Sequence, residues 1–295
     1  MGSPEQAPSS TATAPVIPAH QNYGDADYWD ERYRREPVCF DWYQGYAGLE
    51  PIISRHLSPD APVLHVGAGT SVLQEAMVKE GGFARIVNLD VSKVAVDQMA
   101  ARHRGLPQLE YKLGDVRALT DADGAFGGVL DKGALDAILC GPNAAANSAA
   151  ALRECCRVLR PGGCFVLVTY GDAESRLPHL ARPDLPWTVQ VYVLSKPSAD
   201  GREAGPYGAR AALQGPFDAA RGEAMEALGQ LKGVHFVYVC TRQGAETPAK
   251  TEPEGRAQPA AAAARSGATQ EQNGSSSGGG GKSGGGSGGG ERVAA

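Results

Sequence analysis

The chain has 295 residues, with 28 Lys and Arg against 33 Asp and Glu and a formal net charge of −5. A nucleic-acid partner normally requires a basic patch for its phosphates, and the sequence has no block of Lys or Arg, so the composition argues against one. The six cysteines form no Cys-x-x-Cys pair and no cluster with His, which predicts free thiols in a reducing compartment and no metal site.

The N-terminal stretch, residues 1–22, is rich in Pro, Ala, Ser and Thr without hydrophobic periodicity, so we expect it to be disordered. It has no apolar run long enough for a signal peptide or a membrane helix, and it lacks the arginines of a mitochondrial presequence. We therefore expect a cytoplasmic protein without membrane association.

The first predicted helix begins near Tyr28. Trp29 and Tyr33 are four residues apart, so on a helix they share one face. Such a pair either covers a hydrophobic core or forms the wall of a pocket, and the residues alone leave both interpretations open.

A short apolar run at residues 63–66 is followed by Gly67-Ala68-Gly69, a pattern typical of a buried parallel strand that ends in a glycine turn. A second apolar run ends at Asp90, about 20 residues further on. In such a β-α-β unit the glycines let a ligand approach the backbone, and the carboxylate accepts hydrogen bonds from ribose hydroxyls. The spacing thus indicates a nucleoside-binding site.

The third predicted strand, residues 109–113, runs into Gly114-Asp115-Val116. At that position Asp115 is placed to accept from an adenine amino group, and the Val116 backbone N–H to donate to the ring. A dinucleotide fingerprint would have a third glycine where this sequence has Val72, which disfavours a nicotinamide oxidoreductase.

The rest of the chain predicts a fourth strand that ends in Asp131-Lys132-Gly133, at the edge where open α/β sheets bind their ligands. Further strands and one helix are predicted at 164–170, 187–194, 218–231 (the helix) and 235–240.

Composition predicts the domain boundaries. Residues 196–216 are rich in Gly, Ala and Pro and are expected to form a surface insertion, whereas 244–295 are Ala/Pro-rich and then Gly/Ser-rich, as in a disordered tail. One domain over residues 23–243 is therefore predicted.

These motifs, together with Arg157–Gly163 before a strand, resemble those of a class I, seven-β-strand S-adenosylmethionine (SAM) methyltransferase. The sequence is similar in more detail to one eukaryotic methyltransferase-like subfamily, over about residues 23–243. Its members include lysine methyltransferases of elongation factor 1-alpha and a domain fused to endothelin-converting enzyme 2. The closer similarity is found in Tyr28–Tyr33, Phe40–Tyr43, Leu130–Ala137 and Phe236–Thr241.

The resemblance implies an α/β fold with a Rossmann-like sheet of seven mostly parallel strands, helices on both faces, and an antiparallel last strand between strands five and six. It implies SAM as cofactor and a pocket walled by aromatic residues, with a backbone contact at the end of strand four. The cofactor-binding residues implied in this way are Trp29, Tyr33, Trp42, Gly67, Gly69, Asp90, Val91, Asp115, Val116 and Lys132.

The resemblance also implies a protein substrate that is methylated on lysine, with elongation factor 1-alpha as the candidate. We expect an apolar, aromatic-lined acceptor channel, with Asp136 and Tyr170 as the nearest polar candidates to position the amine; the sequence identifies no catalytic residue. The alternatives are a small-molecule acceptor, another protein nitrogen, or a non-catalytic scaffold, which the intact cofactor positions disfavour.

Overall fold

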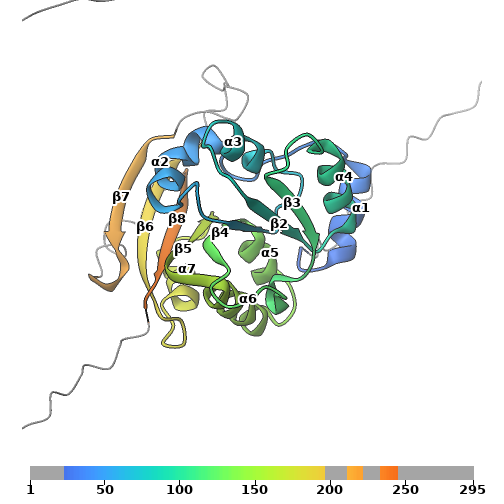
Figure 1. Ribbon diagram of the computed structural model, residues 1–295. Coiled ribbons are helices and arrows are strands. Elements are labelled where there is room, and N and C mark those ends of the chain that lie inside the picture. The colour runs from blue at the N-terminus through green and yellow to red at the C-terminus, as the bar shows by residue number, and fades with distance from the viewer. Residues whose placement is uncertain (1–22, 197–210, 222–232, 245–295) are drawn as a thin grey trace, which may run out of the picture. The chain divides into compact units, whose positions relative to one another are not determined.

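The computed structural model describes residues 23–196, 211–221 and 233–244 (Figure 1). Several expected features lie wholly or mostly outside these ranges: the two disordered tails, residues 197–210 of the insertion, and residues 222–231 of the helix expected over 218–231.

In the described ranges, eight strands form one sheet in the order β3-β2-β1-β4-β5-β8-β6-β7 (Figure 1). Neighbours from β3 to β5 run parallel, β8 is antiparallel to both β5 and β6, and β7 is antiparallel to β6. The strands are β1 Val63–Val66, β2 Ile86–Asp90, β3 Leu109–Leu113, β4 Phe126–Lys132, β5 Leu159–Thr169, β6 Trp187–Ser195, β7 Leu213–Asp218 and β8 Val234–Arg242.

The expected fold class is confirmed, including the antiparallel last strand between the fifth and sixth strands. The sheet has one strand more than expected, because β7 begins inside the segment that we expected to be a surface insertion. No residue of the strand is buried, and the strand contains Gly215 and Pro216, so its sequence has no apolar alternation to reveal it. Its place at the sheet edge explains why a proline is tolerated.

Helices cover both faces of the sheet, so both faces of the central strands are buried (Figure 1). Successive residues of β5 point into opposite cores: Phe165 packs with α6 and α7, and Val166 with α2 and α3. The helices are α1 Ala26–Arg35, α2 Tyr46–His56, α3 Leu73–Lys79, α4 Lys93–Arg102, α5 Ala134–Leu139, α6 Ala144–Val158 and α7 Ala173–Leu180, with short 3-10 turns η1 Val116–Ala118 and η2 Ala219–Arg221.

The register of the parallel strands brings their carboxyl ends to the same level. Val66 of β1 pairs with Leu89 of β2 on one side and with Asp131 of β4 on the other. The residues that follow these three positions therefore gather at one edge of the sheet: Gly67, Asp90 and Lys132.

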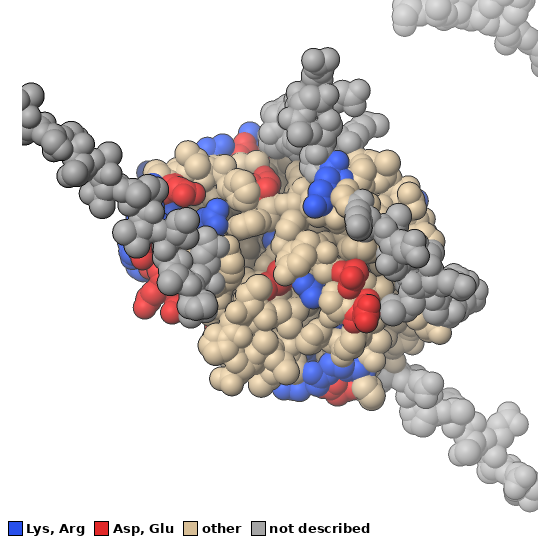
Figure 2. Space-filling view, turned by 180° about the vertical axis from the view of Figure 1, so that it is seen from behind, with Lys and Arg blue, Asp and Glu red and all other residues tan. Residues whose placement is uncertain are grey.

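Charged side chains do not gather into one basic patch on the face drawn in Figure 2, where acidic and basic groups of the described residues are scattered among uncharged ones. Among the described helices, none is long and apolar enough to cross a membrane.

A truncation series tests the predicted boundary at residue 243. Ending the chain at Gly244 keeps β8 and the hydrogen bond from the Gln243 N–H to the Pro186 carbonyl (2.8 Å), so its melting temperature should stay within about 2 °C of the full chain. Ending it at Gly233 removes β8 from between β5 and β6, and thermal unfolding should lose its cooperative transition. A large drop in the melting temperature of the variant that ends at Gly244 would place the domain boundary beyond residue 244.

Candidate functional site

A pocket opens at the carboxyl ends of β1, β2, β3 and β4. It is bounded by the glycine loop after β1, the tips of β2 and β4, the turn after β3, and the segment of residues 23–42 that lies across them. Every residue that the sequence implied for cofactor binding lines this pocket: Trp29, Tyr33, Trp42, Gly67, Gly69, Asp90, Val91, Asp115, Val116 and Lys132.

Asp90 organises the glycine loop. One of its carboxylate oxygens accepts from the Gly69 N–H (2.7 Å) and the other from the Ser92 N–H (2.8 Å). Burial raises the pKa of Asp90, and the same backbone N–H groups act in the opposite direction. The carboxylate is therefore fixed in place, with its remaining lone pairs at the pocket.

The two loop glycines are required by their neighbours. Gly69 has φ +51°, and a Cβ there would lie 2.5 Å from the Tyr33 hydroxyl oxygen; Gly67 has φ +58°, and its Cβ would lie 2.5 Å from that of Ala134. A side chain at either position would both strain the backbone and displace a pocket wall.

Aromatic rings form the wall that α1 contributes. Trp29 and Tyr33 stack with ring centroids 5.8 Å apart, and the Trp29 indole N–H donates to the Tyr23 carbonyl (2.7 Å). The Arg32 guanidinium lies 5.7 Å from the Trp29 ring centroid and 5.1 Å from that of Trp42. A cation is attracted to the faces of such rings, and in this structure Arg32 lies against two of them. Sequence reasoning missed Arg32, although it lies inside the quoted Tyr28–Tyr33 segment.

A half-buried aspartate holds the residue 38–44 segment on the sheet. Asp41 accepts from the Ser71 hydroxyl and from the Val72 N–H (3.3 Å), and forms an ion pair with Lys132 (3.0 Å). Sequence reasoning missed Asp41, because its partners are remote in the chain. The Lys132 ammonium also donates to the Trp42 carbonyl (3.2 Å), so its side chain has a structural role beside the backbone contact expected of it.

A second aspartate, Asp30 on α1, ties that helix to the start of α4. It accepts from the Ser92 hydroxyl (2.5 Å) and from the Val94 N–H (3.2 Å). Together Asp30 and Asp41 close the N-terminal segment over the pocket.

Asp115, expected to accept from an adenine amino group, is engaged by a neighbour. Its carboxylate accepts from the Arg117 guanidinium (2.6 Å) and the Arg117 backbone N–H (2.8 Å), and this arginine holds the pKa of Asp115 below its ordinary value despite the opposing effect of burial. A ligand at this position therefore meets an ion pair instead of a lone carboxylate.

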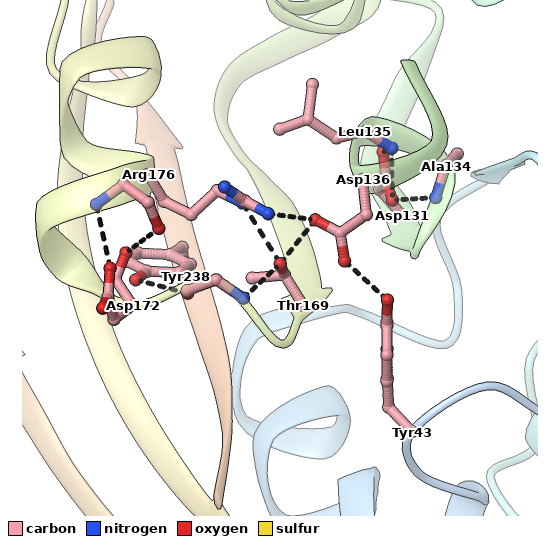
Figure 3. Close-up of polar contacts among 11 residues, drawn as sticks. Tyr43, Asp131, Ala134, Leu135, Asp136, Thr169, Asp172, Arg176 and Tyr238 are labelled. Carbon is pink, nitrogen blue, oxygen red and sulfur yellow. Dashed lines mark hydrogen bonds and ion pairs between the residues drawn. The ribbon is translucent and has the colours of Figure 1, made fainter. Parts of the chain in front are cut away.

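Asp136 is not among the residues that line the pocket, and its expected role in positioning the acceptor amine stays a prediction. It is 4% exposed and accepts from the Tyr43 hydroxyl (2.7 Å), the Thr169 hydroxyl (2.6 Å) and the Arg176 guanidinium (2.7 Å) (Figure 3). Tyr170, the other candidate, is 55% exposed directly after β5.

His65 on β1 forms part of the pocket floor and was not among the expected residues. It is 1% exposed, and within the described part of the chain its Nδ1 has no hydrogen-bond partner. Burial lowers the pKa of His65 to about 4, so the ring is neutral at physiological pH. Among the described residues, no group of His, Cys, Asp and Glu is arranged to hold a metal ion.

The substitution Asp41→Asn should destabilise the domain, because it leaves the buried Lys132 ammonium without a counter-charge. Removal of one partner of a buried ion pair costs about 3–5 kcal/mol of unfolding free energy, measurable by chemical denaturation. Asp97→Asn is the matched control: Asp97 pairs with Lys93 on the surface, where both side chains are more than 60% exposed, and its loss should cost less than about 0.5 kcal/mol.

The same pair predicts a pH dependence. Burial raises the pKa of Asp41, but Lys132 and the hydrogen bonds from Ser71 and Val72 outweigh it, and the pKa lies below its ordinary value. A carboxylate with a lowered folded-state pKa contributes stability that is complete above its unfolded pKa of about 4 and is lost below it. The difference in unfolding free energy between wild type and Asp41→Asn should therefore be largest at neutral pH and become smaller below about pH 4. An equal gap at both pH values would contradict the ion-pair account.

Comparison with known proteins agrees with this geometry. A family model described as a methyltransferase domain matches residues 64–167, which run from β1 into β5. EEF1A lysine methyltransferase 4 of Mus musculus is 30% identical over 194 residues, covering 62% of this chain and 76% of the relative, and that of Bos taurus is 31% identical over 191 residues, covering 61% and 74%. The eEF1A lysine and N-terminal methyltransferase of Mus musculus is 30% identical over 193 residues, which are 63% of this chain but 27% of that relative. The chain therefore belongs to the class I SAM-dependent methyltransferases, in the family of the eEF1A lysine methyltransferases.

Proposed function

We propose that this enzyme is a protein-lysine N-methyltransferase that acts on eEF1A in the cytoplasm. The observation that supports it most is the match to relatives named for that activity, which extends over about three quarters of their length. The catalytic domain in this proposal is residues 23–243, with residues 1–22 and 244–295 outside it.

The pocket residues fit the parts of SAM. In the proposal Asp90 accepts from the ribose hydroxyls, with Val91 beside them, and Asp115 and Val116 bind the adenine. The glycine loop is the most direct test of the fit, because a Cβ at Gly69 would collide with the Tyr33 hydroxyl oxygen of the pocket wall at 2.5 Å. The other contacts are assigned to Trp29, Tyr33, Trp42, Gly67 and the backbone of Lys132.

SAM, when bound, supplies a methyl group activated by a sulfonium, so the protein mainly has to align the acceptor nitrogen with it. Alignment of this kind supplies about 7–11 kcal/mol of barrier lowering. The lysine must first lose a proton, which from a pKa near 10.4 costs about 4–5 kcal/mol at neutral pH. Desolvation at an apolar mouth lowers that cost, and in the proposal this mouth includes the rings of Phe40, which lines the pocket, and of Tyr170.

A second candidate acceptor is a protein α-amine, because one group of relatives is named for both lysine and N-terminal methylation. This chain spans only 27% of those proteins, so the name carries less weight than that of the better-covered relatives.

The proposed cofactor site predicts that Gly69→Ala weakens SAM binding at least tenfold in calorimetry, because the added Cβ displaces Tyr33 from the pocket wall. Gly82→Ala is the matched control: Gly82 also has positive φ (+69°) but has no atom within 4 Å of its would-be Cβ. It should cost about 1 kcal/mol of stability and leave SAM affinity unchanged. Equal affinity for Gly69→Ala would remove the glycine loop from the SAM site.

The acceptor is tested by incubating the purified protein with methyl-labelled SAM and recombinant eEF1A, followed by mass spectrometry of the labelled peptides. We expect label on a lysine side chain, abolished when that lysine is replaced by Arg and reduced with Gly69→Ala. Label on the α-amine would favour the second candidate. Label only in small molecules of an added cytosolic extract, or none despite SAM binding, would overturn the proposal.

A further inference from the structure

Four side chains form a buried polar cluster beside the SAM pocket, which we call the Asp136 cluster: Tyr43, Asp136, Thr169 and Arg176. Asp136 Oδ1 accepts from the Thr169 hydroxyl (2.6 Å) and from Arg176 Nη2 (2.7 Å), while Oδ2 accepts from the Tyr43 hydroxyl (2.7 Å) (Figure 3). Thr169 is fully buried, Asp136 is 4% exposed and Arg176 is 6% exposed. The cluster thus has one member that is only half-buried, Tyr43.

The arrangement fixes the direction of the Tyr43 hydroxyl. An aspartate paired with a buried arginine accepts hydrogen bonds and does not donate them, so the only proton of the Tyr43 hydroxyl is committed to Asp136. Arg176 is itself held: its Nε lies 3.2 Å from the Thr169 hydroxyl, and Gly171 has no side chain at the place where a Cβ would meet the guanidinium at 2.2 Å. The lone pairs of the Tyr43 oxygen therefore point away from Asp136, which Thr169 and Arg176 hold in place.

Tyr43 lies between the cofactor pocket and the protein surface. The preceding residue, Trp42, lines the pocket, and so does Gly133, whose would-be Cβ lies 3.3 Å from the Tyr43 ring and 3.8 Å from its hydroxyl oxygen. On its other side the Tyr43 ring centroid is 6.1 Å from that of the exposed Tyr170 and 5.1 Å from that of His235. The Tyr43 ring therefore lies between Gly133, at the β4 edge of the pocket, and the exposed Tyr170.

The backbone of Tyr43 is strained. Its φ is +62°, a left-handed conformation that costs a non-glycine residue about 1–2 kcal/mol. Strained residues of this kind persist where the surrounding structure holds them, often at functional sites. Here the neighbouring Asp41–Lys132 ion pair and the hydrogen bond to Asp136 hold it.

From these observations we infer that the Tyr43 hydroxyl oxygen binds the acceptor nitrogen of the substrate, and that Asp136 is the positioning residue that presents the lone pair of this oxygen. The inference rests on the proposed function. Tyr43 accepts a hydrogen bond from an N–H of the neutral amine, which turns the nitrogen lone pair toward the methyl group. The N–C bond then forms as the C–S bond breaks, the electron pair stays on sulfur, and the extra proton of the resulting methylammonium passes to solvent.

The competing explanation is that the Tyr43–Asp136 bond only fastens the residue 38–44 segment to α5. That role would change stability and SAM affinity together. The inferred role changes turnover while SAM affinity stays constant, so the two are separable by measurement.

The test compares Tyr43→Phe with Tyr192→Phe, using labelled SAM and recombinant eEF1A. Tyr192 is a matched control, because its hydroxyl also makes one hydrogen bond, to His56 (2.7 Å), and it belongs neither to the Asp136 cluster nor to the pocket lining. We expect Tyr43→Phe to lower kcat about 10- to 100-fold, with the SAM dissociation constant within about twofold of wild type. Tyr192→Phe should keep wild-type kcat.

A double-mutant cycle with Asp136→Asn tests whether Asp136 affects turnover through Tyr43. If Asp136 acts through Tyr43, the double variant should have about the same kcat as the slower single variant, because both changes remove one unit. Should Asp136→Asn fail to fold, Thr169→Val removes one donor to the carboxylate and replaces it in the cycle.

A folded Tyr43→Phe that keeps kcat within about twofold of an active wild type overturns the inference and leaves the proposed function standing. A Tyr43→Phe variant whose lower turnover is explained by weaker SAM binding likewise overturns the inference and leaves the proposed function standing. A wild type that binds SAM but labels no protein nitrogen overturns the proposed function, and the inference with it.

Discussion

The pocket depends on one constraint: the parallel strands must end at the same level, so that their carboxyl ends lie side by side at one edge of the sheet. Because β1, β2 and β4 hydrogen-bond in register, the residues that follow Val66, Leu89 and Asp131 emerge side by side, and the turn after β3 joins them. A shift of register by one residue would turn every side chain of a strand to the other face. The two hydrophobic cores prevent that shift, so packing on both faces of the sheet determines where the ligand-facing groups lie.

The N-terminal segment completes the pocket at an electrostatic cost. Where the segment packs on the sheet, Lys132 and most of the Asp41 side chain are removed from water, and a buried ion pair gains little net stability over an apolar pair of similar shape. Asp41 contacts Ser71, Val72 and Lys132 at the same time, and these contacts together define the position of the segment on the sheet. The aromatic wall, the strained Tyr43 and the Asp136 cluster all depend on that position.

Local patterns made the core of the site predictable from sequence. Gly67, Gly69 and Asp90 belong to one β-α-β unit, whose strand, turn and acid follow one another at a recognisable spacing. Asp41 and the support of Asp136 were not predictable in this way, because their partners are distant in the chain: Tyr43 and Asp136 are 93 residues apart. β7 escaped detection for a different reason, since an exposed edge strand needs no apolar alternation.

The position of β8 has a consequence for how the domain folds. β8 follows every other strand of the described sheet in the chain, yet it pairs with both β5 and β6 in the middle of the antiparallel half. During synthesis, the edges of β5 and β6 that pair with β8 therefore have no native partner until residues 234–242 have left the ribosome. Such late, non-local pairing slows folding and exposes strand edges to other chains while synthesis is incomplete.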